Sequence, residues 1–479
     1  MMNKLNKGQL ATIVLLALMS QSCSLPSLML KKPKAELPAH FASAKFEDHN
    51  TAEINWKDFF DDPYLSELID IALVNNKEVN IMLQRISIAE NEIDARRGEY
   101  LPFVTMGASS ELGKVGEYTR NGAVEKNLDI KEGKPFPKYL ASHQLGLYAS
   151  WELDLWQKLR TSTKVAFMEH LASIEGKNFL VTNLVAEIAS SYYELEALDN
   201  QLDNLNKNIQ IQENALEISK QLQKYARTTS LAVKRFEAEV KKNKSESYAI
   251  KQKITEVENR INFLLGRTPE NIRRASTTFM ETRAKLVETG IPSQLLQNRP
   301  DIRKAELELE ASGLNINVAK ANFYPTFSIK AGLGLEAFNA KYLLNTPESL
   351  ALSVAGDMMA PLINKNAIIA QYKNANALQI KAAYDFELTI INAYSEVSNQ
   401  LANIENLEKS YQLKSTQVEA LTQSIDIANQ LFQSARADYL EVLLTQREAL
   451  EAKKELIETK NKQITAMVNL YRALGGGWH

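Results

Sequence analysis

The feature that most constrains the fold of this chain is a pair of long stretches that almost lack the residues that interrupt helices. Residues 362–474 contain neither glycine nor proline, and residues 138–268 contain no proline and only the glycines Gly146, Gly176 and Gly266. Helices of globular proteins usually run about 8 to 20 residues, so stretches of this length are typical of long helices or coiled coils. The sequence therefore predicts a mainly α-helical chain.

Apolar residues in both stretches repeat with heptad spacing. They step by 7, 3, 4, 3, 4 and 7 in the first stretch and by 4, 3, 7, 7, 3 and 4 in the second. Such seams predict coiled-coil packing. The seam residues are Ile188, Leu195, Leu198, Leu202, Leu205, Ile209 and Leu216, then Val397, Leu401, Ile404, Tyr411, Val418, Leu421 and Ile425.

Four short regions alternate apolar and polar residues, which is the period of a β-strand. Their length matches the roughly 9 to 11 residues of a tilted transmembrane strand with one face for lipid and one for a lumen. Four strands cannot close a barrel, and an open edge in lipid leaves backbone groups without partners, so protomers must combine. Three protomers would supply twelve strands and leave a lumen. The apolar faces carry Val104, Met106, Ala108 and Leu112; Leu145, Leu147, Ala149, Trp151 and Leu153; Phe327, Ile329, Ala331, Leu333 and Leu335; and Leu350, Leu352 and Val354.

The pattern occurs twice along the chain. Tyr100-Leu101-Pro102 matches Phe323-Tyr324-Pro325 at an offset of 223. Thr229-Ser230-Leu231 matches Asp438-Tyr439-Leu440 at an offset of 209, and Gly266 matches Gly475 at the same offset. The chain is therefore predicted to be an internal duplication of helix, hairpin, long helix, turn and helix.

The N-terminus has the layout of a secretory signal. Lys4 and Lys7 precede an apolar run over 10–19 that is too short to span a bilayer. Cys23 follows at the place where bacterial lipoprotein signals carry their acylated cysteine, although Ser20 stands where such signals usually have leucine. We therefore predict Cys23 as a lipidation site. Two acyl chains attached there would anchor the protein stably. The alternative is an ordinary cleaved signal with an incidental cysteine.

Composition and motif spacing exclude several function classes. The 56 basic and 58 acidic residues give a net charge of −2, which provides no excess for binding nucleic acid. A mean hydropathy of −0.28 with 24% charged residues excludes a polytopic helical membrane protein. Gly475 to Gly477 lack the Lys-Ser/Thr of a phosphate loop and are predicted to end a helix. We predict no metal site, because no metal-ligand spacing occurs among His40, His49, His143, His170 and His479. We also predict no catalytic site and no cofactor, since no histidine pairs with the lone cysteine as a catalytic dyad would.

Five motifs in order resemble the outer membrane efflux protein family, the TolC-like channels, and within it the lipoprotein branch that serves resistance-nodulation-division pumps. The resemblance runs from about residue 50 to the C-terminus. The motifs are Trp56-Lys57-Asp58-Phe59-Phe60-Asp61-Asp62-Pro63-Tyr64-Leu65, Trp151-Glu152-Leu153-Asp154-Leu155-Trp156, Arg299-Pro300-Asp301-Ile302, Phe323-Tyr324-Pro325 and Leu474-Gly475-Gly476-Gly477-Trp478.

The resemblance implies a homotrimer in the bacterial outer membrane, lipid-anchored and with a large periplasmic part. Its twelve-stranded β-barrel takes four strands from each chain and continues into a long-helix α-barrel. It implies a passive exit duct, not an enzyme, whose partners are outer membrane lipid, a periplasmic adaptor and an inner-membrane resistance-nodulation-division pump. The alternatives are the outer membrane channel of a type I protein secretion system and a non-porous periplasmic coiled-coil scaffold.

The repeats and the resemblance together divide the chain into ten predicted segments. These are a signal peptide (1–22), an N-terminal extended segment and equatorial belt (23–62), a first-repeat helix (63–101), the first transmembrane hairpin (102–154), first-repeat coiled-coil helices (155–268), an equatorial linker (269–298), a second-repeat helix (299–324), the second hairpin (325–361), second-repeat coiled-coil helices (362–474) and a C-terminal tail (475–479).

The resemblance also implies functional residues in the two turns that end the coiled coils. In the family the second turn narrows the periplasmic aperture with an aromatic residue, an arginine and acidic residues. Matching on Leu440-Glu441-Val442-Leu443 places these on Phe432, on Arg436 beside the arginine position, and on Glu441. The alternative for these residues is a solvated helix face. Adaptor-contacting candidates are Ala226, Ser230, Leu231, Ala435 and Leu440, with Ala226 and Ala435 where the family usually has glycine.

Overall fold

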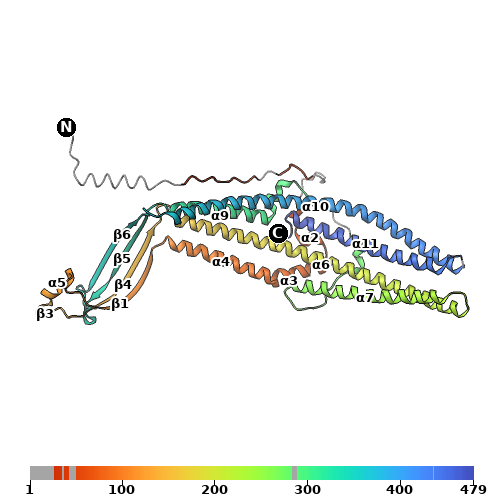
Figure 1. Cartoon of the computed structure of the whole chain (residues 1–479), viewed down its shortest axis with the longest axis horizontal. Coiled ribbons are helices and arrows are strands. Elements are labelled where there is room, and N and C mark those ends of the chain that lie inside the picture. Colours follow the sequence, from red (N-terminus) through yellow and green to blue (C-terminus); the bar gives the residue numbers. More distant parts are fainter. Residues whose placement is uncertain (1–25, 35–36, 42–49, 283–288, 435, 479) are drawn as a thin grey trace, which may run out of the picture. The chain divides into compact units, whose positions relative to one another are not determined.

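The computed structural model describes residues 26–34, 37–41, 50–282, 289–434 and 436–478 (Figure 1). These residues fall into two compact units. Of the described residues, the first unit comprises those within 26–32, 87–170 and 307–383, and the second comprises those within 33–86, 171–306 and 384–478. Cys23 lies outside the described residues.

The first unit contains a four-stranded antiparallel sheet in the order β1-β4-β5-β6. The strands are β1 (Phe103–Gly113), β4 (Leu140–Leu153), β5 (Thr326–Ala337) and β6 (Leu350–Met359). All four strand predictions are confirmed, and β4 and β6 extend beyond the predicted stretches. The two predicted hairpins pair with each other through β4 and β5, so one sheet carries strands of both repeats.

The register of the sheet aligns the apolar residues of all four strands in rows. Met106 pairs with Leu147, which pairs with Leu333, which pairs with Leu352. These four side chains are 75%, 50%, 51% and 73% exposed. Polar residues occupy the other face, where Lys330 Nζ forms an ion pair with Asp357 Oδ2 at 3.1 Å. Because paired residues share a face, the sheet is apolar on one side and polar on the other.

Glycines on the polar face let neighbouring strands approach closely. A Cβ atom on Gly146 would lie 2.9 Å from Gly334 Cα, and one on Gly334 would lie 2.7 Å from Gly146 Cα. The ring of Tyr148 lies against Gly107 on one side and Gly332 on the other. The aromatic ring thereby covers two strand positions that have no side chain of their own.

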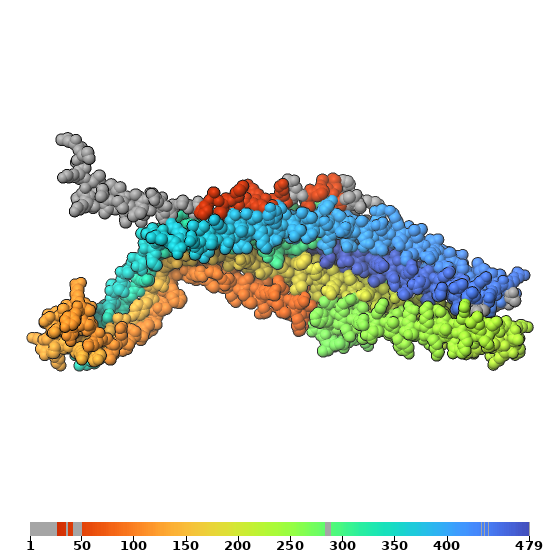
Figure 2. Space-filling view, in the orientation of Figure 1, coloured from red at the N-terminus to blue at the C-terminus, as the bar shows by residue number. Residues whose placement is uncertain are grey.

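An insert between β1 and β4 contains elements that the sequence pattern does not predict. They are α5 (Arg120–Asn127), β2 (Asp129–Lys131) and β3 (Lys134–Pro135), which gather at one end of the sheet (Figures 1 and 2). The β5–β6 connection contains η4 (Ala340–Tyr342). Lys131 Nζ donates to the Tyr342 hydroxyl at 3.1 Å and thereby ties the two connections together.

Four long helices form the coiled coils. They are α6 (Lys158–Lys224), α7 (Ser230–Leu264), α10 (Asn366–Gln433) and α11 (Tyr439–Ala473). Both ends of α7 correspond to those of α11 at the predicted offset of 209, and the last residues of α6 and α10 are also 209 apart. The internal duplication is therefore confirmed in the helices. No helix among the described residues has a run of apolar residues long enough to cross a membrane.

Shorter helices complete the chain. They are η1 (Thr51–Glu53), α2 (Trp56–Phe60), α3 (Pro63–Asn75), α4 (Lys77–Glu99), η2 (Ser276–Glu281), η3 (Pro292–Gln294), α8 (Leu295–Asn298) and α9 (Pro300–Ala321). Pro300 begins α9 and Gly475, with φ of 97°, follows α11. The predicted helix stop at Gly475 is thus confirmed.

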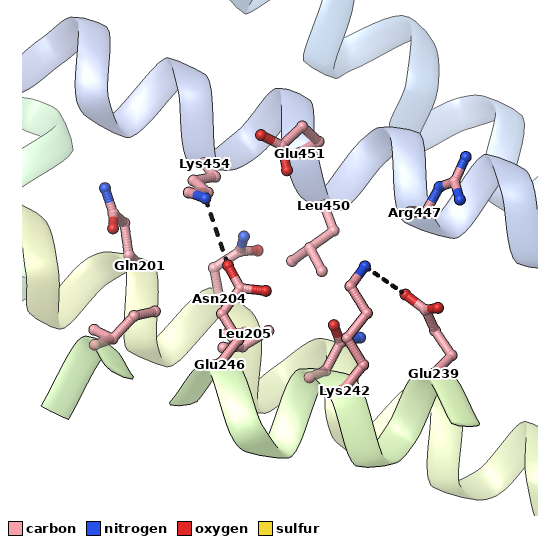
Figure 3. Close-up of a pocket in the computed structure, with 12 residues that line it drawn as sticks. Gln201, Asn204, Leu205, Glu239, Lys242, Glu246, Arg447, Leu450, Glu451 and Lys454 are labelled. Carbon is pink, nitrogen blue, oxygen red and sulfur yellow. Dashed lines mark hydrogen bonds and ion pairs between the residues drawn. The ribbon is translucent and has the colours of Figure 1, made fainter. Parts of the chain in front are cut away.

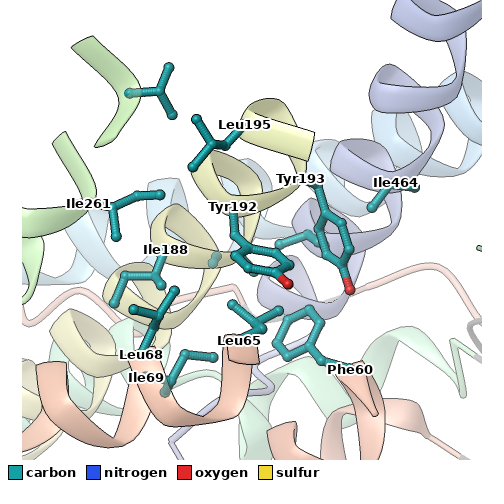
Figure 4. Packing of buried hydrophobic residues seen from close by; sticks show 14 of the residues in the cluster. Phe60, Leu65, Leu68, Ile69, Ile188, Tyr192, Tyr193, Leu195, Ile261 and Ile464 are labelled. Atoms are coloured by element: carbon teal, nitrogen blue, oxygen red, sulfur yellow. The ribbon is translucent and has the colours of Figure 1, made fainter. Parts of the chain in front are cut away.

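The core of the second unit is built around the first tryptophan-containing motif (Figure 4). Asp62 caps α3 by accepting from the amides of Tyr64 at 2.8 Å and Leu65 at 3.0 Å. Phe60 and Leu65 then pack on Tyr192 of α6. The motif therefore combines the end of α2, the Asp62 cap of α3 and two side chains, Phe60 and Leu65, that are buried in the core.

The two heptad seams differ in burial. The first seam is buried except for the half-buried Leu202. Its residues from Ile188 to Ile209 belong to the main apolar cluster of the second unit, together with residues of α2, α3, α7 and α11. In the second seam Val397 is buried, whereas Leu401 and the seam residues after it are half-buried. The predicted first seam is confirmed as a core.

Candidate functional site

The first-repeat tip is a tight turn between α6 and α7. The amide of Ala226 donates to the carbonyl of Gln223 at 2.9 Å, and the amide of Arg227 donates to the carbonyl of Leu222 at 2.9 Å. This pair of bonds ends a helix around a left-handed residue, and Ala226 takes that place with φ of 57°. Alanine therefore adopts the conformation for which glycine is usual.

Side chains also stabilise this first tip. Thr229 Oγ1 accepts from the amide of Ala232 at 3.3 Å and caps α7. Gln223 Nε2 donates to Ser230 Oγ at 2.8 Å across the turn. Leu231 is 59% exposed. Tyr225 in the same turn is 76% exposed, so the tip is a turn that presents two large apolar side chains.

The second-repeat tip repeats part of this geometry. The amide of Arg436 donates to the carbonyl of Leu431 at 2.8 Å, and the amide of Glu441 donates to the carbonyl of Asp438 at 3.1 Å. Ala435 lies outside the described residues. Arg436 and Glu441 are exposed, whereas Phe432 and Leu440 are half-buried. Within the described part of the chain no ion pair joins Arg436 to Glu441, so the aperture assignment stays a prediction.

A charged groove lies between α7 and α11 in the second unit (Figure 3). Lys454 Nζ of α11 lies 3.4 Å from Glu246 Oε1 of α7 and forms an ion pair between the two repeats. Burial alone would lower the pKa of Lys454, but the charges of Glu451 and Glu246 outweigh burial and raise it. The groove encloses only about 40 Å³. It is therefore a contact between helices and too small for a transported compound.

A second polar network surrounds the Arg299-Pro300-Asp301 motif. The Arg299 guanidinium donates to both carboxylate oxygens of Asp301, at 3.0 and 2.8 Å, to Glu396 Oε2 at 2.9 Å and to the carbonyl of Ala473 at 2.7 Å. Arg472 pairs with the same Glu396. The network ties the start of α9 to α10 and to the end of α11, beside a cavity of about 190 Å³.

One buried carboxyl group in the second unit has a strongly perturbed acidity. Glu196 is 3% exposed, and its Oε1 accepts from the amide of Ala275 at 3.2 Å. Burial and, after it, the nearby charge of Asp62 raise the pKa of Glu196 to about 7. Asp62 itself accepts from the Tyr192 hydroxyl at 3.2 Å. No local sequence pattern indicates this group, because its neighbours are distant in the chain.

None of these networks has the composition of a metal centre. Among the described residues, no group of three or more His, Cys, Asp or Glu side chains is arranged to hold a metal ion.

A model of one protein family, described as outer membrane efflux protein, matches residues 68–267 and 291–476. The chain belongs to the outer membrane efflux protein family. The two matched ranges cover both repeats, and the break between them falls in the segment that joins the two repeats. The family resemblance predicted from the five motifs is confirmed.

Individual relatives agree with this assignment. The solvent efflux pump outer membrane protein SrpC of Pseudomonas putida is 26% identical over 423 residues, which cover 88% of this chain and 87% of that protein. The probable outer membrane lipoprotein SilC of Salmonella typhimurium is 24% identical over 483 residues, which cover both chains completely. The structure of the open state of the Neisseria gonorrhoeae MtrE outer membrane channel matches with a TM-score of 0.82 and 21% identity over 94% of this chain and 99% of that one.

Family membership fixes the broad function. The chain is an outer membrane channel component of an efflux system with a TolC-like fold, as the sequence predicted. The family consists of transport components that work with adaptors and inner-membrane pumps, not of enzymes.

Proposed function

We propose that three copies of the chain form a passive exit duct through the outer membrane and across the periplasm. An inner-membrane resistance-nodulation-division pump, reached through a periplasmic adaptor, supplies both the substrate and the energy. The duct itself carries out no chemical reaction. The observation that carries this proposal is the four-stranded sheet with one apolar face and two open edges.

The sheet supports a trimer because it is incomplete on its own. Within the described residues β1 and β6 each pair on one side only. In lipid, unpaired backbone groups cost several kcal/mol each, so the edges require partners. Edge pairing between three copies gives a closed twelve-stranded barrel with the Met106–Leu352 row toward lipid and Lys330 and Asp357 toward the lumen.

Aromatic residues at the helix end of the sheet support placement of this end at a membrane surface. Trp151 Nε1 donates to the Tyr100 carbonyl at 2.9 Å, and Trp156 Nε1 donates to the Pro325 carbonyl at 2.7 Å. The rings of Trp156 and Tyr324 stack at 4.7 Å. Rings of this amphipathic kind are enriched at membrane interfaces.

The names of the relatives favour small-molecule efflux over protein secretion. SrpC is named for a solvent efflux pump. A non-porous scaffold would have no use for a sheet whose apolar face is exposed. We therefore keep efflux as the function and treat type I secretion and the scaffold as the outcomes that the experiments below would reveal.

Cys23 is proposed as the lipid anchor. Its place after the apolar run of the signal supports acylation, and the probable lipoprotein SilC aligns over its whole length. Mass spectrometry of the purified protein should find an N-terminus at Cys23 with attached acyl chains. Cys23→Ala should lose the acyl mass while the trimer still inserts, and a wild-type protein without acyl groups would disprove the anchor.

The tips are proposed as the adaptor contact, with Ala226, Ser230, Leu231, Ala435 and Leu440 at its centre. The exposed Leu231 supports this role, because apolar side chains at a helix end are suited to bind a helical partner. Leu231→Asp should keep the trimer and abolish efflux. The matched control Lys234→Asp lies one turn along the same helix face and should retain efflux.

The trimer itself is tested with the full chain. The mass of the detergent-extracted complex should equal three copies, and the complex should conduct ions in planar bilayers. In a Gram-negative host that lacks its own channel, the chain should restore drug export only together with its pump and adaptor. A stable monomer that retains its β-structure would contradict the proposal.

A further inference from the structure

A buried polar pair interrupts the apolar seam of the first coiled coil. Gln212 of α6 and Asn243 of α7 are 0% and 1% exposed. Asn243 Nδ2 donates to Gln212 Oε1 at 2.8 Å. Gln212 fills the seam position between Ile209 and Leu216 that the heptad pattern skips.

The pair separates two apolar clusters. On one side lies the main core of the second unit, which includes Leu205, Ile209 and Ile250. On the tip side lies a small cluster that consists of Leu216, Val233, Phe236 and Val240. If α7 shifted along α6, the two amides would face these apolar side chains and lose their hydrogen bond. Such a shift would leave buried polar groups without partners, so the native register is favoured over its neighbours.

Two further polar atoms extend the pair. Gln212 Nε2 and Asn208 Oδ1 are both buried and have no hydrogen-bond partner. Asn208 lies one turn before Gln212 on α6, so a donor and an acceptor of matching kind adjoin the pair. Buried amides destabilise a seam relative to apolar residues, and a role in specifying one arrangement is their best-attested use.

The second repeat has apolar residues at the equivalent places. At the offset of 209 that relates α7 to α11, Gln212 corresponds to Leu421 and Asn243 corresponds to Ala452. Ala452 is buried and Leu421 is half-buried. The duplicated coils therefore differ at this level in the chemistry of their contact.

We propose that Gln212 and Asn243 form a register lock for the first coiled coil, and that Leu421 and Ala452 leave the second coiled coil without one at the equivalent level. The polar contact from Gln463 Nε2 of α11 to Glu408 Oε2 of α10, at 3.0 Å, lies farther from the second tip. The lock lies 12 residues before the end of α6, about 18 Å at roughly 1.5 Å per residue, and thus holds the first tip in one position. The second tip, which carries Phe432, Arg436 and Glu441, has no such amide pair at the equivalent level. The part of this inference that concerns opening rests on the proposed channel function.

The lock is tested by exchanging the two chemistries in the full-length trimer. Gln212→Leu with Asn243→Ala copies the second repeat. We expect its thermal midpoint to be equal to or above that of the wild type, while amides of 216–240 exchange about tenfold faster because several registers are populated. Unchanged exchange would show that the pair does not fix the register, and a lowered midpoint with uniformly faster exchange would show that it merely stabilises the coil. Either result would overturn the proposal.

The reciprocal variant, Leu421→Gln with Ala452→Asn, installs the pair in the second repeat. We expect amides of 425–445 to exchange more slowly and channel opening in bilayers to become rarer. Leu421→Ala is the control for a simple loss of packing and should speed exchange in the same segment. If the double variant behaves like Leu421→Ala, the pair is not a lock. If exchange slows in the expected segment but no variant or wild-type protein conducts, the lock stands and the channel function fails.

Discussion

The amide of Arg227 donates to the carbonyl of Leu222 at 2.9 Å and closes the first tip turn around Ala226. The equivalent bond from Arg436 to Leu431 is 2.8 Å long. Both turns therefore end their helices with the same hydrogen bond, although the residue at the left-handed place of the first turn has a Cβ atom. A side chain in this conformation costs roughly 1–2 kcal/mol relative to a right-handed one.

Ala226→Gly should therefore stabilise the first tip. The gain is about 0.5–1 kcal/mol, because relief of the left-handed strain exceeds the added freedom of glycine in the unfolded chain. Hydrogen exchange of the amides in the turn should slow accordingly. The control Ala232→Gly makes the same chemical change inside α7 and should destabilise it by about 1 kcal/mol. Faster exchange in Ala226→Gly would mean that the turn tolerates alanine without strain.

Much of this fold could be predicted from local sequence periodicity. Alternation located the strands, the lack of glycine and proline located the long helices, and the offset of 209 paired the two repeats. The insert with α5, β2 and β3 could not be predicted because residues 114–139 have neither a helical nor a strand period. Pairing of β4 with β5 was also missed, since local alternation carries no information about which hairpin edges meet.

The candidate sites were predictable to a smaller extent. The tip turns follow from the repeat and the family resemblance, and their backbone geometry agrees with a turn at both places. The Glu246–Lys454 ion pair joins residues 208 positions apart, so no local pattern could indicate it. Gln212 did leave a signal, because a polar residue fills one skipped position of an otherwise apolar heptad. The division of the chain into ten segments stays a prediction.

The raised pKa of Glu196 predicts that stability falls as the pH rises. Its pKa in the folded protein, about 7, lies above its ordinary value of 4.5 because burial and the charge of Asp62 disfavour ionisation. The unfolded chain therefore releases the proton first, and the stabilising effect is fully present below pH 4.5 and is lost as the pH rises to 7. At about 1.4 kcal/mol per pKa unit the loss is on the order of 3 kcal/mol.

The variant Glu196→Gln tests this dependence, since glutamine can still accept from the amide of Ala275. Between pH 5 and 8, the thermal midpoint of the wild type should fall relative to that of Glu196→Gln. The control Glu194→Gln lies on the same helix, α6, and removes a surface carboxylate that pairs with Arg260 of α7. It should leave the slope of the wild type unchanged. Parallel curves for wild type and Glu196→Gln would show that Glu196 does not titrate in this range.

The two faces of β6 predict opposite responses to one added charge. Leu352 is 73% exposed in the apolar row, and its neighbour Ser353 points to the polar face. In a barrel, a lysine toward lipid near the midplane costs about 2–4 kcal/mol, whereas one toward the lumen costs little. Leu352→Lys should therefore reduce the amount of trimer folded into the outer membrane, and Ser353→Lys should fold normally and alter conductance. Equal yields would show that this sheet does not separate lipid from a lumen.

The last prediction concerns the aperture at the second tip. Arg436 lies in the turn between α10 and α11, Glu441 lies in the first turn of α11, and both charges are exposed. Phe432 lies in the last turn of α10. Closure by such residues has to rest on weak contacts, because the duct must open when an adaptor docks. Exposed ion pairs contribute about 0 to 1 kcal/mol each, and threefold symmetry raises the total to a few kcal/mol, which biases a two-state gate without locking it.

Replacing Arg436 and Glu441 together by alanine should therefore raise single-channel conductance in planar bilayers and leave the thermal midpoint of the trimer nearly unchanged. Conductance equal to that of the wild type would mean that both residues belong to a solvated helix face and that the constriction lies elsewhere in the duct.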